Sequence, residues 1–537
     1  MMNRVAVTVA ATITTIFTVG NLTSCQPKKV AGEGMEGRMT LGTTAKVSTI
    51  DPADAYSSFA GILLYNLSDR LYTYKPGTRD LVPQLATAMP TVSADGLTYT
   101  MGLRSGVTFH DGERFDAQAM VFSLERFIKS KGAPSFLLGD AIESMRASGP
   151  FELVIKLKKP FAAFPALLAF SGACAVSPKA YTIKEGEFRA KAFVGTGPYR
   201  LAEFGVDRIR LDPFKEYWGE KSANTGMTIQ FFSNEANLFN AFRTGAVDLA
   251  FQSLAIEQTE MLKKESAVQG WQVIEQAGSG VDYLSLNVKS PPLDRLEVRQ
   301  AIAAAIDRPF IHDRVFRKQV TPIYSLIPPT LPEQVPEFRD RYGEMGNAEL
   351  SKQLLKKAGF SAANPLKLDL WYRSNLSKDQ LTMITIKGLM KQSLGDLVTI
   401  ELNGVDSATA YKNLDKGAYP TFLLDWSPDY LDADSYIQPF VDCTKGSAAT
   451  GCEEGATAQQ GSFYFNDRVN RLIADSRTMQ PEKTRRATFS ELQSIVARDV
   501  PFIPLWQGRD YLFAGKGVRG ASIEATQKVP FVRLSKG

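Results

Sequence analysis

Alternation of apolar and polar residues predicts strands in the first third of the chain. Over residues 98–104, Tyr99 and Met101 are separated by small or polar residues, the period of a strand with one buried face. Residues 151–157 repeat this alternation, with an apolar set that begins at Phe151. We expect both segments to be half-buried strands, with Phe151 on the buried side of the second.

A different period predicts helices between and after these strands. Asp116 stands where a helix N-cap is expected, because its carboxylate can accept a hydrogen bond from a free backbone N–H of the first turn. The apolar stripe that follows it consists of Val121, Leu124 and Ile128. Residues 348–360 form a second helical pattern, with lysines in the last turn and Gly359 as its stop. These local patterns predict individual strands and helices.

Composition is that of a globular protein with several domains. The chain has 537 residues, of which 44% are hydrophobic and 22% charged. Its formal net charge of +5 is small for this length, and the basic residues are spread along the chain. A nucleic-acid partner is therefore excluded, because such proteins concentrate their basic residues in a patch.

The first residues predict export from the cell. Arg4 precedes an apolar run from Val5 to Val19, which is shorter than the roughly 20 residues needed to cross a bilayer. The run ends in LTSC (residues 22–25), which looks like a bacterial lipobox, so we expect residues 1–24 to be a signal peptide and Cys25 to be lipidated. An ordinary signal peptide with an incidental cysteine is the alternative. Residues 25–37 are predicted to form a flexible tether.

The remaining cysteines carry separate expectations. Cys443 and Cys452 flank a short loop of small and polar residues, and in an oxidising compartment we expect them to form a disulfide. Cys174 lies among small apolar residues and is expected to be a buried free thiol. No cysteine spacing in the sequence matches a zinc site.

Several segments in order carry a resemblance to a known family. Residues 92–126 (VSADGLTYTMGLRSGVTFHDGERFDAQAMVFSLER), residues 195–200 (GTGPYR) and residues 298–308 (VRQAIAAAIDR) are similar to motifs of the family 5 extracellular solute-binding proteins. These are the peptide- and nickel-type receptors that supply ABC importers. The resemblance extends from about residue 41 to residue 518, in the family's order.

This resemblance implies an α/β fold of two lobes, the periplasmic-binding-protein fold of the Venus-flytrap kind (type II, cluster C), with an extra subdomain in lobe I. The lobes would be joined by two hinge crossings, one at Gly278 and Gly280 and one at 501–506. The implied boundaries are 38–55, 193–277 and 504–537 for lobe I, 56–192 for its extra subdomain, and 278–503 for lobe II.

Residues 422–434 contain the candidate ligand site. An apolar stretch at 422–424 predicts the end of a buried strand, and ligands of open α/β sheets bind beyond such ends. In the peptide-binding branch of the family the pattern W-x-x-D-x-x-D/E stands here, and its first Asp holds the ligand's ammonium group. The resemblance thus assigns this role to Asp429, with Trp426 and Ser427 beside it. The alternative is that Asp429 caps a turn and Trp426 packs in lobe II.

Other charged residues near this region have less specific roles. Arg373 follows a predicted strand, and in dipeptide receptors an Arg of this general region holds the ligand carboxylate. A solvated surface position is the alternative for Arg373. Asp425, Asp432 and Asp434 could form a second cation site, although acidic loops are often simply solvated.

Nothing in the sequence predicts catalysis. His110, in the segment FHDG, has no Ser or Cys nucleophile motif beside it, and the family carries this His in a structural turn. His110 and His312 are the two histidines of the chain, a scarcity that disfavours direct nickel binding. We expect no cofactor and no metal.

The function that the resemblance implies is substrate capture for an ABC importer. A monomeric receptor, held at the outer face of a membrane by its lipid, would close on short peptides and deliver them to a permease and its ATPase. The alternatives are a non-peptide solute (nickel chelate, haem, opine or oligosaccharide), a sensory or chaperone-like role without transport, and, more remotely, an exported hydrolase.

Overall fold

The computed structural model describes residues 37–537, and the predicted signal peptide, most of the tether and Cys25 lie outside them. Within the described residues the largest sheet has nine strands and mixes parallel with antiparallel pairs. Eight of its strands follow the order β16 (Thr421–Trp426), β12 (Gln272–Leu286), β19 (Phe502–Ala514), β11 (Leu249–Phe251), β1 (Met39–Thr43), β10 (Met227–Phe231), β9 (Arg208–Pro213), β8 (Tyr199–Phe204). The ninth, β13 (Val320–Pro322), pairs with β19.

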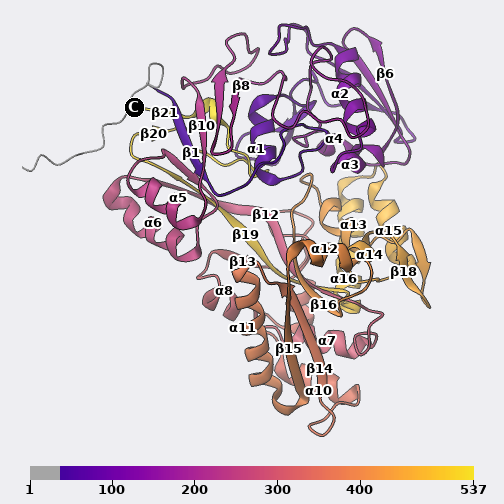
Figure 1. Cartoon of the computed structure of the whole chain (residues 1–537). Helices are drawn as coiled ribbons and strands as arrows, with labels where there is room; N and C mark the ends of the chain where they lie inside the picture. The colour runs from indigo at the N-terminus through magenta and orange to yellow at the C-terminus, as the bar shows by residue number, and fades with distance from the viewer. Residues whose placement is uncertain (1–36) are drawn as a thin grey trace, which may run out of the picture. The chain divides into compact units, whose positions relative to one another are not determined.

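Two long antiparallel strands, β12 and β19, connect the two ends of this sheet. The last residues of β19 pair with β11, which in turn pairs with β1, whereas from Val281 onward strand β12 pairs with β16. Figure 1 shows β12 and β19 crossing between the β1–β10 strands above and β16, β14 and β15 below. Their register shifts between Ala277 and Val281, so the backbone at Gly278 and Gly280 departs from regular pairing.

A separate four-stranded sheet holds the first strands predicted from sequence. Its order is β4 (Thr91–Val92), β5 (Thr98–Gly102), β7 (Glu152–Leu157) and β6 (Ile142–Gly149). Tyr99 and Met101 are buried, as predicted, and the Asp116 carboxylate caps α2 (Ala117–Lys129) by accepting from the Ala119 N–H. The prediction for Phe151 is wrong: it lies in the turn before β7 and is 40% exposed, because the alternation begins only at Leu153.

Smaller sheets and many helices complete the described part of the chain. The two-stranded pairs are β2 (Tyr72–Tyr74) with β3 (Leu81–Pro83), β14 (Leu366–Arg373) with β15 (Val398–Val405), β17 (Lys445–Ser447) with β18 (Gly451–Glu454), and β20 (Val518–Arg519) with β21 (Ser535–Lys536). The remaining α-helices are α1 (Ser58–Leu67), α3 (Ser135–Gly139), α4 (Phe164–Leu167), α5 (Glu235–Arg243), α6 (Ile256–Gln269), α7 (Leu296–Ala304), α8 (Arg308–Arg314), α9 (Glu337–Tyr342), α10 (Ala348–Lys357), α11 (Ser377–Leu394), α12 (Ser407–Leu414), α13 (Asp434–Val441), α14 (Ala456–Gln459), α15 (Asp467–Arg477) and α16 (Glu482–Asp499). No helix among residues 37–537 is long and apolar enough to cross a membrane.

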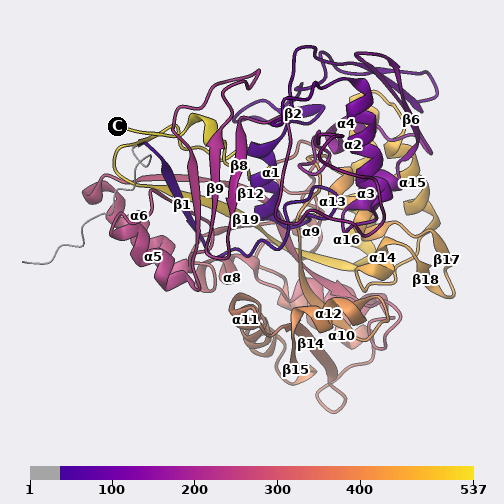
Figure 2. The same ribbon diagram turned by 45° about the horizontal axis from the view of Figure 1, so that its top comes forward.

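Separate hydrophobic cores lie on the two sides of the long strands. One core draws its residues from Val281 to Trp506, and a second from Leu71 to Ala175. A third combines residues near the start of the described chain with others from Leu512 to Leu534. Tyr430 is an exception to this separation, because it follows β16 in sequence but packs in the second core. Figure 2 shows α13 and α15 drawn close to the α2–α4 region that contributes to that core.

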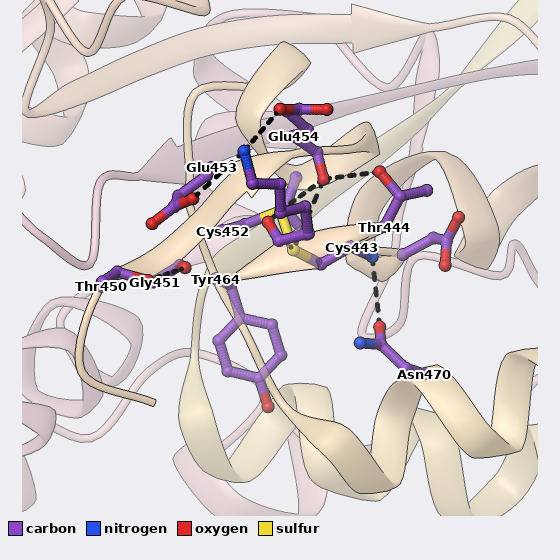
Figure 3. Close-up of a disulfide and its surroundings, with 12 residues drawn as sticks. Cys443, Thr444, Thr450, Gly451, Cys452, Glu453, Glu454, Tyr464 and Asn470 are labelled. Carbon is purple, nitrogen blue, oxygen red and sulfur yellow. Dashed lines mark hydrogen bonds and ion pairs between the residues drawn. A yellow bond between two sulfur atoms is a disulfide. The ribbon is translucent and has the colours of Figure 1, made fainter. Parts of the chain in front are cut away.

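The cysteines of the described residues take two states. Cys443 and Cys452 form a disulfide at the base of the β17–β18 hairpin, and the Cys443 N–H donates to Asn470 Oδ1 at 3.1 Å (Figure 3). The disulfide therefore ties the hairpin close to helix α15. Cys174 is a free thiol and is buried.

Candidate ligand-binding site

A cavity of about 280 Å³ lies beyond the end of β16. Its walls come from parts of the chain that are distant in sequence: α1 and the residues just before it, residues 70–74, residues 166–172, Ser279 of β12, the end of β16 with the loop after it, and residues 526–528. The residues that contribute most of its polar character are Tyr56, Ser57, Ser58, Arg70, Asp425, Ser427, Asp429, Gln527 and Lys528. Its volume lies just below the usual range for drug-sized ligands, which favours a small occupant.

The loop after β16 is held rigidly where it enters the cavity. Trp426 ends the strand opposite Val281 of β12, and its indole N–H donates to the Ser435 carbonyl at 2.8 Å. The same ring packs edge-on against Phe440, with ring centroids 5.7 Å apart. Trp426 therefore fixes the loop through its contacts with Ser435 and Phe440, and it also lines the cavity together with the exposed Ser427.

Asp429 is the acidic group of the cavity that lacks a cationic partner. The Tyr56 hydroxyl donates to its Oδ1 at 2.9 Å, and no Lys, Arg or His of residues 37–537 lies within ion-pair distance of it. Burial raises the pKa of Asp429 from 3.8 to about 6, and the hydrogen bond from Tyr56 offsets part of this rise. A ligand ammonium at this point would supply the missing countercharge.

Tyr56 reaches Asp429 from the opposite wall of the cavity. Its ring packs edge-on against Phe136 and Phe170, at centroid distances of 6.0 and 6.2 Å. Further contacts join the same two walls: the Leu431 N–H donates to the Tyr74 hydroxyl at 3.2 Å. These contacts bring the loop after β16 against the region that begins at α1.

Arg373 takes a position different from the one expected for a ligand contact. It does not line the cavity; its Nε donates to Asp379 at 2.8 Å, it forms a further ion pair with Asp425, and it donates to the Tyr411 hydroxyl. Arg373 is also almost fully buried, so the alternative of a solvated surface residue is wrong. Its charge is matched by two carboxylates, and its observable role is to hold Asp425 at the cavity's edge.

The other acidic residues of the loop are also neutralised by arginines. Asp432 pairs with Arg485 at 2.6 Å, and Asp434 pairs with Arg477 at 2.7 Å. The Tyr430 hydroxyl donates to Asp434 as well, at 2.7 Å. Because their charges are already paired, Asp432 and Asp434 do not form the second cation site considered from sequence. Residues 37–537 contain no cluster of His, Cys, Asp and Glu that could hold a metal ion.

His110 lies in a structural turn outside the cavity lining. Its Nδ1 accepts from the Gly195 N–H at 3.3 Å, and its Nε2 lies 3.0 Å from the Gly197 carbonyl oxygen. Burial lowers the pKa of His110 from 6.5 to about 4, so the ring is neutral at physiological pH. These bonds join the FHDG segment to the GTGPYR segment.

Sequence reasoning missed the residues that face Asp429 across the cavity. Tyr56 stands in the segment AYSS, and Lys528 in the segment TQKV, neither of which has a motif or a periodicity that points to a ligand. Arg70 is likewise unremarkable in sequence although it is buried beside the cavity. No local signal could have identified these three residues.

Comparison with known proteins identifies the family. The model of the bacterial extracellular solute-binding proteins, family 5 (Middle), matches residues 80–448. The chain belongs to this family. The glutathione-binding protein GsiB of Escherichia coli (strain K12) is 27% identical to this family member over 475 residues, which cover 87% of this chain and 88% of GsiB. GsiB of Salmonella typhi is also 27% identical, over 482 residues.

Solved structures of solute-binding proteins share the two-lobe fold. The dipeptide-binding protein from Pseudoalteromonas sp. SM9913, in complex with Met-Leu, has a TM-score of 0.76 at 21% identity, covering 93% of this chain and 100% of that one. DppA from Helicobacter pylori, in complex with the peptide STSA, has a TM-score of 0.75 at 23% identity, covering 93% and 98%. CtaP from Listeria monocytogenes has a TM-score of 0.79 at 19% identity, covering 93% and 99%.

Proposed function

We propose that this solute-binding protein is the receptor of an ABC importer and captures short peptides in the cavity beyond β16. The observation that carries the proposal is the Asp429 carboxylate, which faces the cavity with a hydroxyl partner but no cation. A peptide's terminal ammonium supplies the charge and the N–H donors that this carboxylate lacks. No chemical step is performed on the ligand.

The surroundings of Asp429 suit recognition of a peptide backbone. Ser427 lies exposed at the end of β16 and lines the cavity, so its backbone groups are available to an extended chain. Pairing of this kind reads the main chain and tolerates varied side chains. Glutathione, which the relatives named GsiB bind by their name, is a short peptide with a free α-ammonium group and belongs to the same chemical class.

Release and capture of the ligand follow from two lobes that close on it. We assign residues 38–55, 193–277 and 504–537 to lobe I, 56–192 to its extra subdomain and 278–503 to lobe II. With these boundaries, the bond between Tyr56 and Asp429 crosses from one lobe to the other. A ligand that touches both walls favours the closed arrangement by its difference in affinity for the two states.

The cellular setting proposed for the receptor follows from its family and from the start of its sequence. A monomer anchored through lipidated Cys25 would remain in the periplasm or at the outer cell surface and present its ligand to a permease and its ATPase. This setting requires export, which the predicted signal peptide at residues 1–24 provides.

The direct test is native mass spectrometry of the purified protein, followed by denaturation and identification of the released compound. We expect di- or tripeptides, or glutathione. Release of one non-peptide compound, such as a metal chelate or a porphyrin, would retain the receptor role and overturn the peptide assignment. A protein that carries nothing is then titrated with trialanine and glutathione, and binding of neither would also overturn it.

A further inference from the structure

The cavity that Asp429 lines also contains two cationic side chains that no ion pair neutralises. Lys528 and Arg70 both line the cavity, and no carboxylate of residues 37–537 lies within ion-pair distance of either one. Arg70 is only 1% exposed. Lys528 is partly buried. Charges that are shielded from water are normally paired, so two unpaired cations at one cavity indicate that the partner is a ligand.

The Lys528 ammonium is held in place by the backbone around it. A tight turn precedes it: the Glu524 N–H donates to the Lys528 carbonyl at 2.7 Å, and Gln527 adopts a positive φ of 62°. The Gln527 amide donates to Asp510 at 2.9 Å, which anchors the turn to strand β19. This arrangement directs Lys528 toward α1 and the cavity.

Gly61 of α1 leaves space for the Lys528 ammonium. A Cβ atom at Gly61 would lie 2.9 Å from Lys528 Nζ, a contact that real Cβ atoms do not tolerate. The Ser171 hydroxyl is 3.5 Å from the same position. The absence of a side chain at Gly61 therefore allows Lys528 to lie against the helix where both line the cavity.

Among residues 37–537, no group accepts a hydrogen bond from the Lys528 ammonium. Asp510 is the nearby carboxylate: its Oδ1 accepts from the amides of Gln252 and Gln527, each at 2.9 Å, and its Oδ2 is buried without a hydrogen-bond partner. Neither oxygen lies within ion-pair distance of Lys528. Burial and the proximity of Arg70 lower the pKa of Lys528 from 10.5 to about 8, and Asp510 opposes this shift. The Arg70 guanidinium donates to the Ser68 carbonyl at 3.0 Å and to the Tyr65 carbonyl at 3.5 Å, and it lies over the Tyr65 ring, 4.8 Å from its centroid.

We propose that Lys528, supported by Arg70, is an anion subsite that binds the carboxylate of the peptide whose ammonium is bound by Asp429. This inference rests on the proposed function and adds the class of ligand, a peptide with both termini free. Arg373, the residue that the sequence suggested for the carboxylate, is already occupied by Asp379 and Asp425.

The test compares free acids with amides by titration calorimetry. Trialanine and glutathione are each prepared with the C-terminal residue as carboxylate or as amide and titrated into the wild-type protein and into Lys528→Met. We expect the wild type to bind the acids at least about tenfold more tightly than the amides, since hydrogen bonds between ionised groups are the strong ones. Lys528→Met should reduce this ratio to less than about threefold.

Two further variants distinguish the loss of the Lys528 charge from a general effect of substitution or a folding defect. Lys264→Met removes an equally charged, exposed residue of α6, outside the cavity lining, and should keep the wild-type ratio. Lys528→Gln removes the charge but keeps a polar tip, so it should lower the ratio even if Lys528→Met fails to fold. An unchanged acid-to-amide ratio in whichever of Lys528→Met and Lys528→Gln folds would overturn the subsite.

The outcomes also distinguish this inference from the proposed function. Suppose that the wild type binds the peptides, that Asp429→Asn lowers their affinity, and that the two Lys528-site variants keep the wild-type ratio of acid to amide affinity. In that case only the anion subsite is refuted. If the wild type binds neither peptide, or if Asp429→Asn leaves their affinity unchanged, the proposed role of Asp429 fails first.

Discussion

Replacement of Asp429 by Asn should make the ligand-free protein more stable and its peptide complex weaker. In the folded protein, burial raises the pKa of this carboxyl from 3.8 to about 6. The native state therefore holds the proton more tightly than the unfolded chain. As pH rises through the window from about 4 to about 6, the free energy of unfolding falls, and it stays lower at neutral pH.

The size of this effect can be worked from the shift. A difference of about two pKa units corresponds to about 3 kcal/mol at about 1.4 kcal/mol per unit. Asp429 is only half-buried by surface exposure, and cavity water screens its charge, so we expect a gain of about 1–2 kcal/mol for Asp429→Asn at pH 7. At pH 3.5 the gain should nearly vanish, because both the native and the unfolded carboxyl are then largely protonated.

Ligand affinity should change in the opposite direction. Loss of the charged partner of a peptide ammonium should weaken binding by about 2–5 kcal/mol, as at other enclosed charge pairs. Urea unfolding at pH 7 and pH 3.5 measures the first effect, and titration calorimetry with trialanine the second. Asp396→Asn, at a carboxylate whose side chain is 84% exposed, provides the matched control.

Two results would refute this reasoning. An unchanged peptide affinity would remove Asp429 from the binding site. A lower stability of Asp429→Asn at pH 7 would mean that the hydrogen bond from Tyr56 outweighs the penalty for burying the charge, contrary to the direction of the pKa shift.

Four further predictions address the pH dependence, the ion pairs, the disulfide and the anchor. Peptide affinity should fall about tenfold between pH 7 and pH 5, because protonation of the Asp429 carboxyl, with its pKa of about 6, removes the charge that binds the ammonium. Titration calorimetry should show this fall in the wild type and not in Asp429→Asn. Arg373→Met should lower the free energy of unfolding by about 3 kcal/mol, because it leaves Asp379 and Asp425 without their buried partner. A free energy from urea unfolding that lies within about 1 kcal/mol of the wild-type value would contradict this. Replacing Cys443 and Cys452 together by Ser should lower the free energy of unfolding by roughly 2–3 kcal/mol, because the unfolded chain gains freedom without the disulfide. The reduced wild type is the control, and equal stability of the oxidised wild type and the variant would contradict this prediction. Cys25→Ser should move the protein from the membrane to the soluble fraction after cell fractionation, and continued membrane association would contradict lipidation.

Local patterns in the sequence predicted elements well where neighbours along the chain decide the structure. Asp116 caps α2 as expected, because a cap depends on hydrogen bonds within one helical turn. The helix at 348–360 was also predicted: α10 ends at Lys357, and Gly359 adopts a positive φ of 82° just beyond it. Phe151 was assigned wrongly because the alternation does not reveal where a strand begins.

The family and the loop after β16 could also be recognised from sequence, since their motifs are contiguous. The sequence could not show which charged residues lack a partner of opposite charge. Asp425, Asp429, Asp432 and Asp434 look alike along the chain, yet three of them pair with arginines and only Asp429 is left with a hydroxyl partner. Which carboxylates are neutralised depends on residues many positions away.

The sequence by itself thus determined the family, the α/β class and the segment that contains Asp429, the proposed ligand contact. The tertiary structure alone decided that Tyr56, Arg70 and Lys528 face that segment across one cavity, and that Arg373 is occupied elsewhere. The physical reason is that a motif records hydrogen bonds and turns between near neighbours. Countercharge and burial depend on distances through space, which the folding of the whole chain sets.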